Sequence, residues 1–230
     1  MRKIIKVSVF HFLVFLIYLF IDSDLHSDDI LIAIYNLYCG LTADNDISGF
    51  TIITCVTLSI SLICTLQKEI GIYYDMYKYI WCRCRSAVFF IEKCMLKIII
   101  LCISGSFFIF IICNIISCIA NTNLYFIVTM KIILLIFLSF VQYSLLISNL
   151  YCLKFGYNHI LLLMSVLVIL SPVINVSNNF VLKLLVLFPD VNAIGFNLIS
   201  GKIILILFLM IVWWINQKRY EEIDAKNNKV

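Results

Sequence analysis

Apolar runs about as long as a lipid bilayer is thick dominate this sequence. A helix needs roughly 20 consecutive apolar residues to cross the hydrocarbon core, and the runs Ile47 to Leu66 and Met95 to Ala120 reach that length. The mean hydropathy is +1.09. Only 13% of the residues are charged, whereas soluble domains average about 25%. The chain is therefore predicted to be an all-α, polytopic membrane protein and not a soluble domain.

We predict a single transmembrane domain over residues 1–230 with about six helices. The expected spans are approximately residues 4–21, 47–66, 95–120, 126–151, 157–174 and 194–215. Between the last two, Phe180 to Phe188 form an apolar run that is too short to cross a bilayer and is followed by Pro189. This run is expected to lie in the interface or to dip in and return. Lys202, near the outer end of the last span, is expected to extend its ammonium group toward the headgroups.

The distribution of positive charge predicts the orientation of the spans. Of the seventeen Lys and Arg residues, this topology places three on the outer side (Lys131, Lys183 and Lys202) and fourteen on the inner side. Lys and Arg accumulate in cytoplasmic loops, so both termini are predicted to be cytoplasmic. Residues 22–46 carry six Asp and no Lys or Arg and are predicted to be external, with an outer-surface amphipathic helix over Ile30 to Leu41.

Positive charge collects in the inner segment between the second and third spans, residues 67–94. Six Lys and Arg residues fall between residues 67 and 97, and charged and apolar residues recur there at helical spacing. We expect a cytoplasmic, partly helical segment. Three interpretations remain open: a helix on the inner leaflet, a docking surface for a soluble partner, or a surface loop with no partner.

Groups that could support catalysis are scarce. Within the spans, His11, Asn114 and Gln142 are the polar residues that an enzyme could use, and they suggest no catalytic set. No GxxxxGK[ST] motif is present, so the chain is not expected to hold ATP phosphates by that device. Cys82 and Cys84 supply too few ligands for a metal site, and the ten cysteines are expected to be reduced. We therefore predict a non-catalytic protein without a cofactor.

The inner segment also carries a pattern that resembles a known family. A basic first helix, an acidic outer segment and a second span precede the inner run Tyr77-x-Tyr79-Ile80-x-x-Arg83-x-Arg85-Ser86-x-x-Phe89-Phe90-x-x-Lys93. This order resembles the permease subunit of a type-2 ABC exporter, especially the small six-span permeases of bacteriocin or peptide-antibiotic export and immunity systems.

The resemblance implies a permease in the bacterial plasma membrane that works with a separate ATPase subunit and a second, identical or related, permease copy. Segment 67–94 would couple the two subunits, and the candidate coupling residues are Tyr79, Trp81, Arg83, Arg85 and Lys93. A peptide-like or amphipathic substrate is expected, and no nucleic acid partner. The alternative is a stand-alone membrane immunity or regulatory protein without transport activity.

Overall fold

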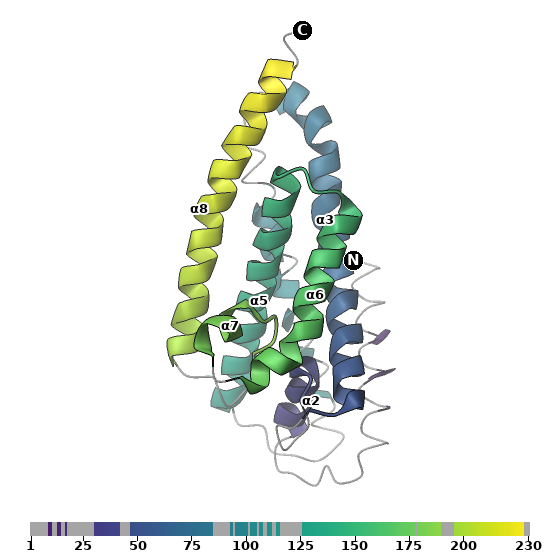
Figure 1. The fold of residues 1–230 in the computed structure, drawn as a ribbon. Coiled ribbons are helices and arrows are strands. Elements are labelled where there is room, and N and C mark those ends of the chain that lie inside the picture. The colour runs from purple at the N-terminus through teal and green to yellow at the C-terminus, as the bar shows by residue number, and fades with distance from the viewer. Residues whose placement is uncertain are drawn as a thin grey trace.

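In the computed structural model of the chain, every secondary-structure element among the described residues is a helix (Figure 1). The described residues are 9–10, 13–14, 17, 30–41, 47–84, 93, 95–100, 102–104, 106–107, 110–111, 114–115, 126–177, 179–189 and 196–227. Both chain ends lie outside these ranges, so the cytoplasmic termini stay a prediction.

Four helices are long and apolar enough to cross a membrane, and by their length and composition the chain is a membrane-spanning protein. The helices are α3 (Gly49–Cys84), α5 (Phe126–Cys152), α6 (Tyr157–Val176) and α8 (Phe196–Asn227). Their apolar stretches are Gly49–Ile72, Met130–Cys152, Tyr157–Val176 and Asn197–Arg219. These four helices overlap the predicted second, fourth, fifth and sixth spans. The predicted spans 4–21 and 95–120 are described only in short helical pieces.

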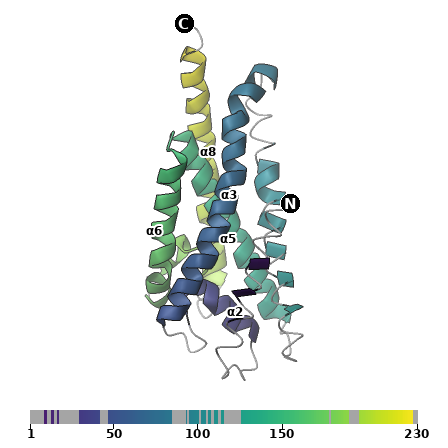
Figure 2. The same cartoon turned by 90° about the vertical axis from the view of Figure 1, so that its right-hand side faces the viewer.

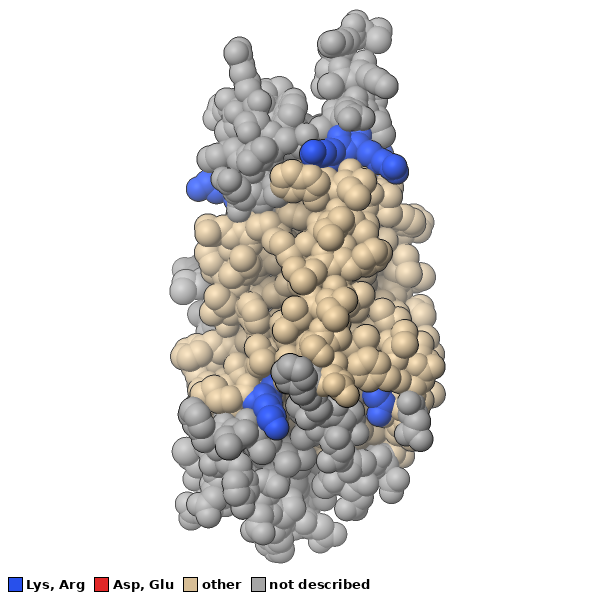
Figure 3. Space-filling view, turned by 90° about the vertical axis from the view of Figure 1, so that its left-hand side faces the viewer, with Lys and Arg blue, Asp and Glu red and all other residues tan. Residues whose placement is uncertain are grey.

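Helix α5 lies at the centre of the bundle. It packs along α8 and also contacts α3, while α3 packs along α6 (Figure 1). Most α5 side chains between Leu135 and Asn149 are buried. The outer faces of α6 and α8 are apolar and exposed, as lipid-facing surfaces require. On the face shown in Figure 3, the described Lys and Arg residues lie at the two ends of a broad band without charged groups.

Helix α2 (Ile30–Cys39) confirms the predicted short helix but not its predicted position on the outer surface. Tyr35, Leu37 and Tyr38 are at most 1% exposed, because α3, α6 and the residues after α7 surround this helix. Gly40 ends it at φ 78°. Its N–H donates to the Leu37 carbonyl while the Leu41 N–H donates to Asn36, which is the Schellman arrangement.

Helix α7 (Phe180–Leu185) begins the re-entrant segment, defined here as residues 180–189. The Asn179 side chain accepts hydrogen bonds from the Val181 and Leu182 N–H groups and so caps α7. The backbone then leaves helical geometry, and Val186 to Pro189 are buried. Figure 1 shows α7 beside the first turns of α8. A short helix followed by a buried non-helical stretch is compatible with both expectations, a run in the interface and a run that dips in and returns, and the choice between them stays a prediction.

Helix α3 is longer than the predicted second span. Its 36 residues correspond to a length of about 54 Å, and its apolar stretch ends at Ile72. Residues 67–84 of the predicted coupling segment therefore continue the spanning helix without a break (Figure 2). This part of the segment is not a separate helix.

Candidate functional site

The predicted coupling residues are only partly described. Tyr79, Trp81 and Arg83 occupy helical positions in the last turns of α3, and Lys93 is helical with an exposed side chain. Arg85 lies outside the described residues. The described residues therefore do not test whether these side chains form one site, and their coupling role stays a prediction.

The re-entrant segment poses a problem of hydrogen bonding. Val186, Leu187 and Phe188 are each at most 2% exposed, and their backbone is not helical. Backbone of this kind can occur at membrane depth only where protein groups or enclosed water satisfy its carbonyls. In this bundle, side chains from four helices provide the donors.

Helices α5 and α8 provide the hydrogen-bond donors for the carbonyls of residues 184 to 186. Gln142 Nε2 donates to the Leu184 carbonyl at 3.0 Å. The Tyr143 hydroxyl donates to the Leu185 carbonyl at 3.3 Å. Lys202 Nζ donates to the Val186 carbonyl at 3.0 Å. Three consecutive carbonyls, those of residues 184 to 186, thus receive a side-chain hydrogen bond.

Helices α6 and α2 provide the donors for the carbonyls of Phe188 and Pro189. Asn175 Nδ2 donates both to the Phe188 carbonyl and to the Cys39 carbonyl, each at 3.0 Å. The Tyr35 hydroxyl donates to the Pro189 carbonyl, also at 3.0 Å. The Asn175 amide therefore connects the end of α2 to the re-entrant segment. The Tyr35 hydroxyl of α2 fixes Pro189, the last residue of that segment.

Aromatic packing also holds the re-entrant segment in place at Phe188. The Phe188 ring lies 4.7 Å from the Tyr38 ring and meets the Phe140 ring edge-on at 6.3 Å. The edge-on arrangement with Phe140 places the positive edge of one ring near the face of the other and stabilises that pair beyond simple burial. Phe188 is thereby anchored between α2 and α5.

Lys202 is the group that sequence analysis placed wrongly. It was expected to extend toward the surface, but it is 0% exposed. Its Nζ donates to Ser139 Oγ at 2.8 Å and to Gln142 Oε1 at 3.1 Å, besides the Val186 carbonyl. An ammonium group has three N–H donors, and these three neutral acceptors use all of them. The acceptors inside the bundle therefore compensate for the hydration that Lys202 loses.

Lys202 and its three acceptor residues, Ser139, Gln142 and Val186, are called the lysine cage below. Sequence analysis noted Gln142 only as a polar residue that an enzyme would need. No signal in the sequence indicated this contact, because Gln142 lies near the middle of its predicted span whereas Lys202 lies near the outer end of another. Asn114, the other amide noted, donates to the Phe110 carbonyl of its own helix.

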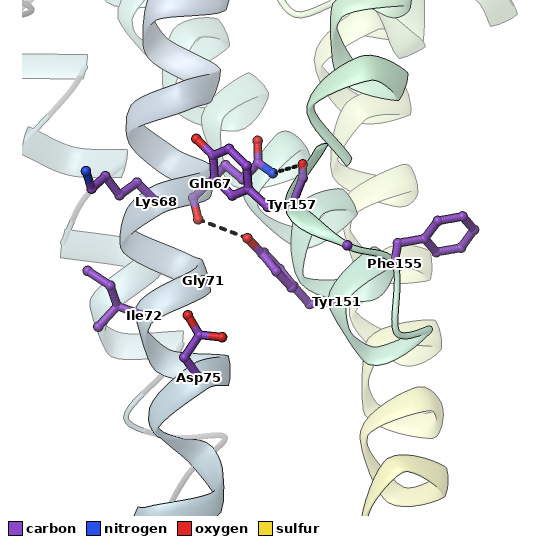
Figure 4. A pocket seen from close by; sticks show the side chains of 9 residues that line it. Gln67, Lys68, Gly71, Ile72, Asp75, Tyr151, Phe155 and Tyr157 are labelled. Carbon is purple, nitrogen blue, oxygen red and sulfur yellow. Dashed lines mark hydrogen bonds between the residues drawn. The ribbon is translucent and has the colours of Figure 1, made fainter. Parts of the chain in front are cut away.

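The end of the bundle that the charge distribution predicts to face the cytoplasm is called the inner end below. A cleft is the second notable feature of the structure, and it lies at this end. A cleft of about 430 Å³ opens there between α3 and the α5–α6 connection (Figure 4). Its lining residues are Gln67, Lys68, Gly71, Ile72, Asp75, Tyr151, Phe155, Gly156 and Tyr157. Gln67 Nε2 donates to the Tyr157 carbonyl at 2.6 Å, which joins α3 to the start of α6.

Behind this cleft, three helices are joined by aromatic residues. Trp213 Nε1 on α8 donates to the Tyr74 hydroxyl on α3 at 2.8 Å, and the Tyr74 ring stacks on Tyr151 of α5 at 5.2 Å. Trp213 is buried, whereas Trp214 is exposed. Of these two residues, Trp214 alone has the exposure expected of an interfacial tryptophan.

Comparisons with protein-family models, with curated proteins and with solved structures find no match for this chain. The functional argument below depends on the residues of the chain itself.

Proposed function

We propose that this protein is the membrane-spanning permease subunit of an ATP-driven exporter in the bacterial plasma membrane. It would move a peptide-like or amphipathic substrate together with a separate ATPase subunit. The observation that supports this proposal most is the re-entrant segment held by the lysine cage. Broken, non-helical segments between spans are a recurring feature of transporters, where they line or close a pathway.

The chemistry of the cage adds to this argument. An ionisable residue inside a membrane span is costly and commonly marks a functional site. Well-packed apolar residues can replace a buried charged group with little loss of stability, and sometimes with a gain. If position 202 contributed only packing, Leu or Met there would give the bundle similar stability. Lys202 instead joins the last span to the re-entrant segment through a hydrogen bond to the Val186 carbonyl.

Helix α3 supplies a mechanical connection to a partner. It continues from Ile72, the end of its apolar stretch, to Cys84, and it packs along α6, which leads into the re-entrant segment. A partner that pushed on the end of α3 would shift a rigid helix and the spans packed on it. Rigid-body shifts of packed helices are a common form of switching transition. ATP hydrolysis on the partner would thereby change the packing around the pathway.

The test is purification of the tagged protein together with the ATPase encoded beside it. The double variant Arg83→Glu with Arg85→Glu should lose the ATPase and transport. Lys218→Glu with Arg219→Glu is the matched control, because it makes the same charge change at the inner end of α8. Equal ATPase retention by both variants would contradict the coupling role. If no ATPase associates and the protein alone protects cells from a toxin, the stand-alone immunity function replaces this proposal.

A further inference from the structure

Helix α8 exposes one face along most of its apolar stretch. The helix packs on α5 and α7, and the side chains of Lys202, Leu209 and Trp213 are buried. Figure 1 shows α8 along one edge of the bundle. The side chains on its other side are exposed and are called the exposed α8 face below: Ile204, Leu207, Phe208, Ile211, Trp214, Ile215 and Lys218.

The apolar part of this face has the length of one lipid leaflet. Ile204 and Trp214 are ten residues apart, which corresponds to about 15 Å along a helix. The hydrocarbon core of a bilayer is about 30 Å thick, so each leaflet contributes about 15 Å. Between these two residues, Phe208 is 58% exposed and Ile211 is 61% exposed. One acyl chain of the inner leaflet could therefore cover the face from Trp214 to Ile204.

An aromatic ring and a positive charge lie where this face reaches the inner end of the bundle. Trp214 is exposed, and Lys218 Nζ lies 5.3 Å from the centroid of its ring, within the range of a cation–π contact. The ammonium group is thus held at the edge of the apolar stretch. Glu221 and Glu222 follow further along α8, beyond the end of that stretch. Among the described residues, no carboxylate forms an ion pair with Lys218.

The surface around Lys218 presents positive charge. Arg219 is the next residue and is also exposed. Figure 3 views the side of the bundle on which α8 lies, and no described Asp or Glu is visible there. Basic residues at the inner surface of a membrane attract anionic headgroups, and a guanidinium group can form two parallel hydrogen bonds with a phosphate. An anionic group attached to an apolar chain therefore complements this face.

We propose that the exposed α8 face binds an anionic phospholipid of the inner leaflet whose phosphate is its only charged group. Lys218 and Arg219 would donate hydrogen bonds to the phosphate oxygens. The Trp214 ring would lie at the level of the headgroup, as interfacial tryptophans do, and an acyl chain would cover Phe208 and Ile211. In a choline phospholipid, a quaternary ammonium group neutralises the phosphate, so this lipid should bind more weakly.

The experiment is native mass spectrometry of the full-length protein with phosphatidylglycerol or phosphatidylcholine carrying identical acyl chains. Each Lys or Arg near an anionic headgroup contributes a factor of about five, so the wild-type protein should retain phosphatidylglycerol roughly five- to thirtyfold more. Lys218→Gln with Arg219→Gln should remove most of this preference. Lys68→Gln with Lys154→Gln is the matched control, because it removes two exposed positive charges from the same end of the bundle, and it should keep the preference.

Tryptophan fluorescence locates the bound lipid. Bromine atoms on an acyl chain quench the tryptophan rings that they contact, so brominated phosphatidylglycerol added in detergent should quench the wild-type protein. Most of this quenching should disappear in Trp214→Phe. It should persist in Trp81→Phe, the control, because Trp81 lies outside the apolar stretches.

Three outcomes would overturn the proposal. An equal loss of preference in the two double variants would mean that the lipid responds only to the overall charge of the inner end. An unchanged preference in Lys218→Gln with Arg219→Gln would remove these cations from the site, and unchanged quenching in Trp214→Phe would place the lipid elsewhere. These readouts do not depend on transport or on the ATPase.

Discussion

Lys202 Nζ lies 2.8 Å from Ser139 Oγ, and this contact joins the last span to the central helix of the bundle. Lys202 is the sixth residue of its apolar stretch, Asn197–Arg219, so it lies about 8 Å along the helix from the outer end of that stretch. The ammonium group thus sits inside the bundle and not at its rim. It connects α5, α8 and the re-entrant segment at one point.

Replacing Lys202 with Met separates its functional role from its packing role. The variant loses three hydrogen bonds but also the cost of burying a charge, so the free energy of unfolding should change by less than about 2 kcal/mol. Transport should fall to background. Lys183→Met on α7 is the control, because it removes a lysine from the same segment outside the cage. Full transport by Lys202→Met, measured in proteoliposomes with the ATPase, would show that the cage serves packing alone.

Asn175→Leu should destabilise the outer end of the bundle. It leaves the Cys39 and Phe188 carbonyls without their donor, and each unpaired buried acceptor costs about 1–3 kcal/mol. The expected loss is about 2–4 kcal/mol, measured as a lower thermal midpoint in detergent. Asn158→Leu, at an exposed position near the start of α6, should leave the midpoint nearly unchanged. Similar midpoints for both variants would mean that Asn175 does not hold the re-entrant segment.

Gly40→Ala should also destabilise the protein. The residue has φ 78°, and a Cβ atom there would lie 2.5 Å from Pro172 Cγ on α6. The left-handed conformation and the overlap should together cost about 1–3 kcal/mol. Gly49→Ala is the matched control, since no atom lies within 4 Å of its Cβ position. A thermal midpoint for Gly40→Ala equal to that of Gly49→Ala would contradict the close contact between α2 and α6.

Gly71 and Tyr151 should behave as a coupled pair. Gly71→Ala places a methyl group 2.6 Å from the Tyr151 hydroxyl oxygen and should cost about 1–3 kcal/mol through overpacking. Tyr151→Phe removes that oxygen. In the double variant the overlap is relieved, so the total loss should be smaller than the sum of the two single losses by about 1 kcal/mol. Additive losses, measured from thermal or denaturant unfolding, would show that the two residues do not meet.

The length and composition of the apolar runs were sufficient to predict four of the spans, the helix over Ile30 to Cys39 and the short run before Pro189. These features depend on local sequence, because a span must be apolar along its whole length. The burial of α2 and of Lys202 could not be predicted in the same way. A helix that is apolar on every side gives little sign of which face meets its neighbours, so the acceptors that surround Lys202 become apparent only once α5, α7 and α8 are packed.

The hydrogen bond from Tyr35 to the Pro189 carbonyl spans 154 positions of the chain, and it sets an order of events during synthesis. At about 5–20 residues per second, the ribosome would finish residue 189 roughly 8–30 seconds after residue 35. Throughout that interval the Tyr35 hydroxyl has no Pro189 carbonyl to which it can donate. The contact between α2 and the re-entrant segment can therefore form only after more than three quarters of the chain has been made.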